Sequence, residues 1–144
     1  MLNVQDERLR EAYATDEIKA LAKARDALAQ TAMGFSQLMM KGEISYAALH
    51  ATPFLQMFGD TVVGWILLRQ AIKAKELYDV HLQKYEADGI DEELGQILTE
   101  DAEARFLHGK IATANFFVHQ ILPRVRARQA AVKSDDRSAL NVVL

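Results

Sequence analysis

The chain has four histidines, the side chains best suited to bind a metal or move protons, and their spacing argues against both roles. Helical bundles that hold two iron ions use a Glu-x-x-His motif on two helices. The residues three positions before the four histidines are Ala47, Tyr78, Arg105 and Phe116. No histidine has another histidine or a carboxylate four residues later. We therefore expect packed or surface imidazoles at His50, His108 and His119, a solvated edge at His81 beside Tyr78 and Tyr85, and no metal site.

Other catalytic patterns are also missing. The chain contains no cysteine, so thiolate nucleophiles, disulfides and cysteine-bound metals are excluded, and a reducing cytoplasm is the simplest location. The seven glycines never form the G-x-G of a dinucleotide loop. Ser36 follows Gly34 but precedes Leu38, which breaks the G-x-S-x-G nucleophile motif. We therefore expect no catalytic residue and no cofactor-binding residue in this chain.

Three polar residues remain as site candidates. Asp60 lies inside the most apolar stretch, where a buried carboxylate needs a partner. A structural hydrogen bond or exposure at an edge is favoured there over a functional carboxylate. Arg124 and Arg128 are one helical turn apart and suit an anionic group such as a nucleotide phosphate, whereas Arg126 points about 200 degrees away from them. A solvated helix end is the favoured reading of these arginines.

Composition limits the partners. The chain has 144 residues, 50% of them hydrophobic, and a formal net charge of -3. Nucleic-acid binding needs a net basic surface, so it is not expected. The longest apolar run, Thr61 to Leu68, is far shorter than the ~20 residues that cross a bilayer, so no membrane partner is expected. This length and apolar content predict a single domain over residues 1–144.

Apolar residues recur at helical spacing along most of the chain, without the alternation of a strand. The pattern predicts main helices over 16–41, 45–87 and 99–132, a short helix or structured loop over 91–98, and a tail over 133–144. Gly42 suits a left-handed cap of the first helix, and Thr99 is the expected N-cap of the third. We expect an all-α, antiparallel, four-helix-bundle-like fold, in which a short helix or a second subunit completes the three main helices.

Pro53 divides the second helix into two possible readings. In one, Thr52 is an N-cap and Pro53 the first helical residue; in the other, which we prefer, one long helix kinks at the proline. Pro123 similarly bends or ends the third helix.

The stretch from His50 to Ala71 contains two glycines that cost a helix about 2 kcal/mol together. Gly59 and Gly64 lie about 140 degrees apart around the axis. We therefore expect two different helices to approach, one over each glycine. The apolar residues around them leave no polar face, which predicts a helix buried on all sides, with a helix from a second copy as the preferred cover. The packing and interface candidates are Phe54, Phe58, Gly59, Gly64, Trp65 and Phe117.

Two segments carry a family resemblance. The first has the pattern Ala51, Phe54, Leu55, Phe58, Gly59, Gly64, Trp65, Leu67 and Ala71; the second has Lys110, Ala114, Phe116, Phe117, Leu122 and Pro123. In order and separation they resemble the C-terminal helical domain of acyl-CoA dehydrogenases, in the subgroup with an acetyl-CoA-dehydrogenase-like C-terminal domain. The resemblance covers roughly Ile18 to Val132.

This resemblance implies a context in fatty-acyl-CoA metabolism. In the family, FAD, the acyl-CoA and the catalytic glutamate belong to upstream domains, and no segment here matches the Y-E-G-T-N-G motif that carries the glutamate. The chain thus resembles a fragment or a separately encoded copy of an accessory domain, not an enzyme by itself. We expect it to act in helix packing or subunit association, as a homo-oligomer or with a dehydrogenase subunit.

Two other functions remain open. One is a helical bundle that binds a small acyl-CoA-like ligand, with Arg124 or Arg128 on its phosphates. The other is a catalytic subunit whose active site forms only with a partner chain.

Overall fold

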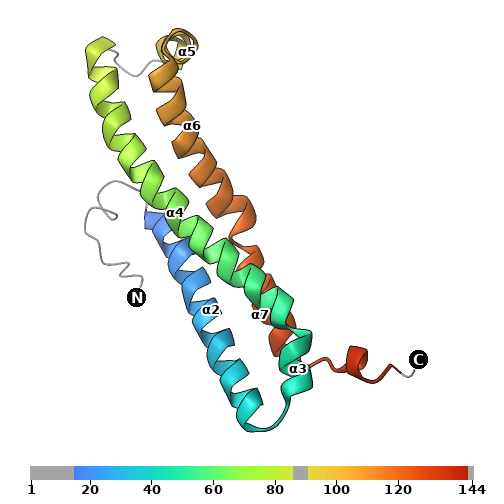
Figure 1. Cartoon of the computed structure of the whole chain (residues 1–144). Helices are drawn as coiled ribbons and strands as arrows, with labels where there is room; N and C mark the ends of the chain where they lie inside the picture. Colours follow the sequence, from blue (N-terminus) through green and yellow to red (C-terminus); the bar gives the residue numbers. More distant parts are fainter. Residues whose placement is uncertain (1–14, 86–90, 143–144) are drawn as a thin grey trace.

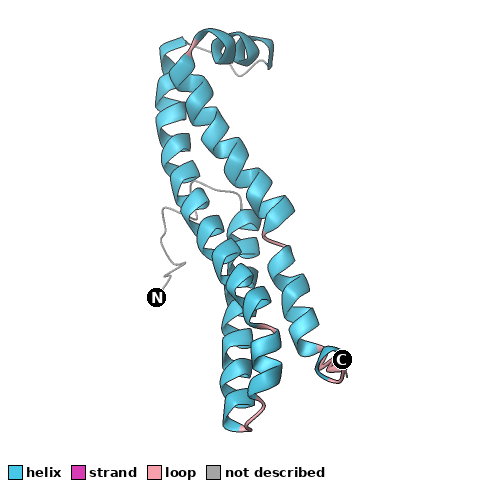
Figure 2. Cartoon of the chain, turned by 45° about the vertical axis from the view of Figure 1, so that its right-hand side comes forward, coloured by secondary structure: helices cyan, strands magenta, loops and turns pink. Residues whose placement is uncertain are grey.

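The computed structural model describes residues 15–85 and 91–142, and these residues form helices joined by short loops (Figure 2). The helices are α2 (Thr15–Met40), α3 (Ile44–Leu49), α4 (Ala51–Leu82), α5 (Asp91–Glu100), α6 (Ala102–Phe116) and α7 (Arg124–Lys133). Short 3₁₀ turns cover Gln83–Tyr85 and Ser138–Leu140, and a π turn covers Phe117–Ile121. The predicted all-α class is confirmed. The expected breaker Gly89 lies outside the described residues.

The long helices run antiparallel. The chain descends through α2, returns along α4 and descends again through α6 and α7 (Figure 1). Helix α4 packs against α6 along its C-terminal half and against α2 and α7 along its N-terminal half. Helix α4 is therefore the element on which the others assemble.

One face of α4 builds the core. Its buried residues recur at spacings of three and four, at Met57, Thr61, Gly64, Leu68 and Ala71. They meet buried residues of α2 and of the chain from α6 to α7, namely Leu21, Ala24, Ala27, Ala114, Val118, Leu122 and Val125. The Thr61 hydroxyl donates a hydrogen bond to the Met57 carbonyl, 2.8 Å away, which satisfies it inside the core.

Helix α2 ends as the sequence predicts. Gly42 has a φ of 75°, the left-handed conformation that glycine adopts without strain. The N–H groups of Gly42 and Glu43 then donate to the carbonyls of Met39 and Leu38 at 3.0 and 2.9 Å. This pattern satisfies two carbonyls that the helix leaves free.

The prediction of one long helix kinked at Pro53 is wrong. The chain turns at His50, which separates α3 from α4 and is the N-cap of α4, so Thr52 is not the cap either. Pro53 lies in the first turn of α4, where the N–H groups have no helical partner, so its missing N–H costs nothing. The first regular bond runs from the Phe54 N–H to the His50 carbonyl at 3.0 Å.

The predicted helix over 99–132 is divided twice. Asp101, not Thr99, is the N-cap of α6, and Thr99 instead donates to the Gly95 carbonyl inside α5. Further along, the backbone widens into the π turn, in which the Leu122 N–H donates to the Phe117 carbonyl at 2.9 Å. Pro123 has no N–H to continue the ladder, so α7 begins after it, at Arg124.

Candidate interaction surface

The face of α4 opposite the core is apolar and exposed. The exposed fractions are 69% for Leu55, 52% for Phe58, and 42% each for Val63 and Ile66. The expectation that this helix is buried on all sides is therefore wrong for the chain by itself. Exposed apolar patches of this kind mark interaction sites on soluble proteins. We call the face formed by Leu55, Phe58, Gly59, Val62, Val63 and Ile66 the outer face of α4.

The two glycines of α4 have different surroundings. A β-carbon on Gly64 would lie 3.2 Å from Leu122 Cδ1 and 3.5 Å from Phe117 Cε1, so the chain packs closely over this position. A β-carbon on Gly59 would meet no atom of the described residues within 4 Å. The expected close approach is present at Gly64, and within residues 15–85 and 91–142 it is absent at Gly59, because Gly59 lies on the outer face and Gly64 on the core face.

The aromatic candidates have separate places. Phe54 is half-buried against Phe35 of α2, with 5.0 Å between ring centroids. Trp65 is half-buried under the guanidinium of Arg69, which lies 5.1 Å from the ring centroid. Phe117 is also half-buried and packs on the core. Among the four aromatic candidates, the fourth, Phe58, is the one that belongs to the exposed outer face.

Asp60 has a specific partner. Arg128 Nη1 of α7 donates to Asp60 Oδ2 at 2.5 Å, and the two side chains are 24% and 22% exposed. Arg124 is exposed and lies outside this pair. The favoured reading of Asp60 as a structural hydrogen-bond acceptor fits this geometry, because the ion pair ties α4 to α7.

A polar cluster joins the end of α4 to the start of α6, and the sequence did not reveal it. Asp101 Oδ2 lies 2.5 Å from both His81 Nε2 and the Tyr85 hydroxyl, while its Oδ1 accepts the N–H groups of Glu103 and Ala104. The expected solvated edge at His81 is wrong, since this residue is buried. The signal available in the sequence was the spacing of His81 and Tyr85, one turn apart on one helix face.

The cluster leaves no reactive group free. The Tyr85 hydroxyl, the His81 imidazole and the backbone N–H groups hold the pKa of Asp101 well below its usual range, and donation to Asp101 raises the pKa of Tyr85. Lys84 Nζ lies 3.2 Å from His81 Nδ1. Both imidazole nitrogens and both carboxylate oxygens are therefore engaged, which suits a structural clamp more than acid–base catalysis.

A cavity of about 550 Å³ opens beside the cluster of Tyr85 and Asp101. Its lining is Tyr85, Gln96, Ile97, Glu100, Asp101, Ala102 and Glu103. Three carboxylates in this lining would repel the pyrophosphate shared by FAD and coenzyme A, so the cavity does not fit either group.

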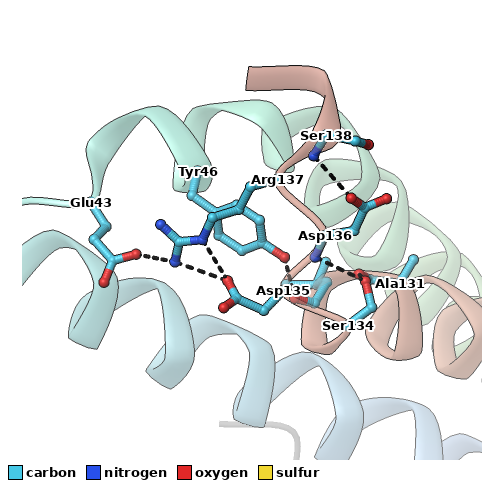
Figure 3. A network of polar contacts seen from close by, with 9 residues as sticks. Glu43, Tyr46, Ala131, Ser134, Asp135, Asp136, Arg137 and Ser138 are labelled. Carbon is cyan, nitrogen blue, oxygen red and sulfur yellow. Dashed lines mark hydrogen bonds and ion pairs between the residues drawn. The ribbon is translucent and has the colours of Figure 1, made fainter. Parts of the chain in front are cut away.

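A second network fixes the segment after α7 (Figure 3). Arg137 pairs with Glu43 and Asp135 and lies over the ring of Tyr46, 5.0 Å from its centroid. The Tyr46 hydroxyl donates to the Val132 carbonyl at 2.9 Å. Burial raises the pKa of Tyr46, and the hydrogen bonds to Glu43 and Asp135 raise the pKa of Arg137. These contacts hold the end of α7 on α3.

Within residues 15–85 and 91–142, no group of three or more histidine or carboxylate side chains could hold a metal ion. By length and mean hydropathy alone, the segment Ala51–Tyr85 is long and apolar enough to cross a membrane. Helix α4 provides most of this segment, and one of its faces forms the core while Asp60 pairs with Arg128. The apolar residues of this segment are divided between the core face and the exposed outer face.

Comparison with known proteins places the chain in a family. The family model described as "Acetyl-CoA dehydrogenase C-terminal like" matches residues 3–142. No curated protein sequence matches the chain. The family match covers both segments that carry the resemblance, residues 51–71 and 110–123, and the helices between them. The chain therefore belongs to the family of acetyl-CoA-dehydrogenase-like C-terminal domains.

Proposed function

We propose that this chain is a non-catalytic accessory domain that associates with another protein subunit through the outer face of α4. The observation that carries the proposal is the exposed apolar surface around Gly59, which nothing in the described chain covers. A glycine inside a helix costs about 1 kcal/mol relative to alanine. A partner helix that packs closely over Gly59 would offset this cost.

The polar chemistry supports an accessory role. Asp60, His81 and Asp101 are mostly enclosed, and each is engaged in contacts that join helices. The FAD and the acyl-CoA of the related dehydrogenases therefore belong, in this proposal, to a partner subunit or to another domain. Fatty-acyl-CoA metabolism is the context that the family membership favours, and the absence of cysteine favours a reducing cytoplasm.

The accessory role is tested with the purified chain and a purified FAD-dependent acyl-CoA dehydrogenase. The chain alone is expected to show no flavin absorbance and no oxidation of acyl-CoA in the presence of an artificial electron acceptor. Phe58→Glu should weaken association with itself or with the dehydrogenase, whereas Val80→Glu, exposed on the same helix beyond Arg69, should not. Acyl-CoA oxidation by the chain alone, or equal effects of both variants, would contradict the proposal.

A groove between α2 and α7 supports a second candidate, the binding of an acyl-CoA-like ligand. Its volume is about 290 Å³, with an apolar floor that includes Ala20, Val118, Leu122 and Pro123. Lys23 and Arg126 lie at this groove and suit an anionic head group, whereas Lys19 pairs with Asp16, which also lines the groove. Isothermal titration with an acyl-CoA tests it: heat that disappears in Lys23→Ala and Arg126→Ala supports binding here, and no heat at millimolar ligand excludes it.

A further inference from the structure

The outer face of α4 contains the seam of a helix pair. Leu55, Gly59, Val62 and Ile66 follow one another at spacings of four, three and four, which is the pattern of the a and d positions of a coiled coil. The next seam position is Arg69, so the uncharged seam ends there. Its apolar part, from Leu55 to Ile66, is about 17 Å long.

The seam is self-complementary when two copies run antiparallel. Its midpoint lies between Asp60 and Thr61, whose side chains point toward the bundle: Asp60 pairs with Arg128 and Thr61 is buried. About a two-fold axis at this midpoint, Leu55 of one copy faces Ile66 of the other, and Gly59 faces Val62. The isopropyl group of Val62 then fills the open space over Gly59, where the described residues 15–85 and 91–142 place no atom within 4 Å.

A parallel pair of the same helices is less favourable. It would place Gly59 against Gly59, which leaves a void at the centre of the seam. It would also place Arg69 against Arg69, two like charges at the end of the seam. In the antiparallel pair each Arg69 instead lies beside Thr52 of the other copy, which carries no charge.

We infer that the partner of the outer face is a second copy of this chain, crossing antiparallel at Gly59 and Val62. This inference rests on the proposed function, because it names the partner of the same surface.

The available area indicates the strength of this pair. Leu55, Phe58, Val63 and Ile66 are 69%, 52%, 42% and 42% exposed, so only part of each side chain is available to a new interface. A stable interface of standard size buries about 800 Å² per partner. The flanking residues Gln56, Trp65 and Arg69 must supply part of the remainder. An interface below the standard size suits a weak, reversible dimer.

Sedimentation equilibrium of the full chain between 1 and 100 µM tests the dimer. Gly59→Leu should raise the dissociation constant more than tenfold by blocking close approach, while the fold remains intact because no atom of the described chain lies within 4 Å of this position. Gly109→Leu, at another glycine with no atom within 4 Å of its β-carbon, is the matched control and should leave the constant unchanged. A second disruptive variant, Val62→Glu, introduces a charge into the centre of the seam.

The orientation is tested with a short bis-maleimide, since the natural chain has no cysteine. A mixture of Leu55→Cys and Ile66→Cys chains should form the mixed cross-link, whereas Leu55→Cys alone should not, because its two thiols lie about 17 Å apart along the antiparallel pair. Efficient cross-linking of Leu55→Cys to itself would overturn the antiparallel arrangement. A monomer at 100 µM would overturn self-pairing, and if that monomer still binds the dehydrogenase through Phe58, the proposed function stands.

Discussion

Gly64 of α4 lies under Leu122, so close that a β-carbon on the glycine would come within 3.2 Å of Leu122 Cδ1. This contact joins α4 to the chain between α6 and α7 at the centre of the core. A larger side chain must displace Leu122 and Phe117, both of which are held by surrounding residues.

Gly64→Leu should therefore destabilise the fold by about 1–3 kcal/mol or more, because it overfills a packed site. Gly59→Leu, on the same helix but with no atom within 4 Å, should retain or slightly raise the stability of the monomer. Urea unfolding at a protein concentration below the dissociation constant of the dimer measures the stability of both variants. Equal destabilisation by the two variants would contradict the assignment of the glycines to opposite faces.

Removal of one member of the Asp60–Arg128 pair should cost about 1–2 kcal/mol, between the values for exposed and buried ion pairs. The reason is that each partner is mostly enclosed, so the remaining charge loses its nearest counter-ion. A double-mutant cycle with Asp60→Asn and Arg128→Met, followed by urea unfolding, isolates the pair. An interaction energy of zero would show that the contact does not join α4 to α7.

The low pKa of Asp101 predicts a loss of stability in acid. A carboxylate whose pKa is lower in the folded state than in the unfolded chain stabilises the fold above the unfolded value of about 4, and this contribution disappears as the pH falls through the folded value. Urea midpoints measured from pH 7 to pH 2.5 should fall below about pH 4. Asp101→Asn, which keeps an N-cap acceptor, should weaken this pH dependence. If the urea midpoints of the variant fall with acid as steeply as those of the natural chain, Asp101 is not the cause.

Tyr46→Phe should lower the stability by about 1 kcal/mol, since it leaves the Val132 carbonyl without its buried donor. The contact connects α3 with the end of α7 and supports the neighbouring Arg137 network (Figure 3). Tyr78→Phe is the control, because no hydrogen bond of the Tyr78 hydroxyl occurs in the described part of the chain. Thermal unfolding compares the two, and equal midpoints would argue against the contact.

Periodicity and local chemistry predicted much of the fold. The spacing of apolar residues predicted the helical class, and the position of Gly42 predicted the end of α2. The boundary at Asp101 was missed because it depends on which of several adjacent residues caps the helix, and the boundary at His50 was missed because no side chain caps α4 there. Propensity scarcely distinguishes Thr99 from Asp101, and the contact of Asp101 with His81 and Tyr85 across the turn favours the latter.

The surface was predicted only in part. Composition alone indicated that α4 has apolar residues all round, but not which face the chain itself covers. Gly59 and Gly64 have the same sequence signal, and only the positions of Leu122 and Phe117 assign Gly64 to the core. Asp60 and Arg128 likewise come from segments far apart in the chain, so their pairing depends on the packing of α7 against α4.

The accessibility of residue 66 tests the central claim most directly. In a chain without natural cysteines, Ile66→Cys supplies a single thiol on the outer face, and Val80→Cys supplies an exposed control on the same helix. The rate of alkylation at position 66 should fall as the chain is concentrated or as the dehydrogenase is added, while the rate at position 80 stays constant. Alkylation at position 66 that is equally fast under all these conditions would contradict the assignment of the outer face of α4 as the docking surface.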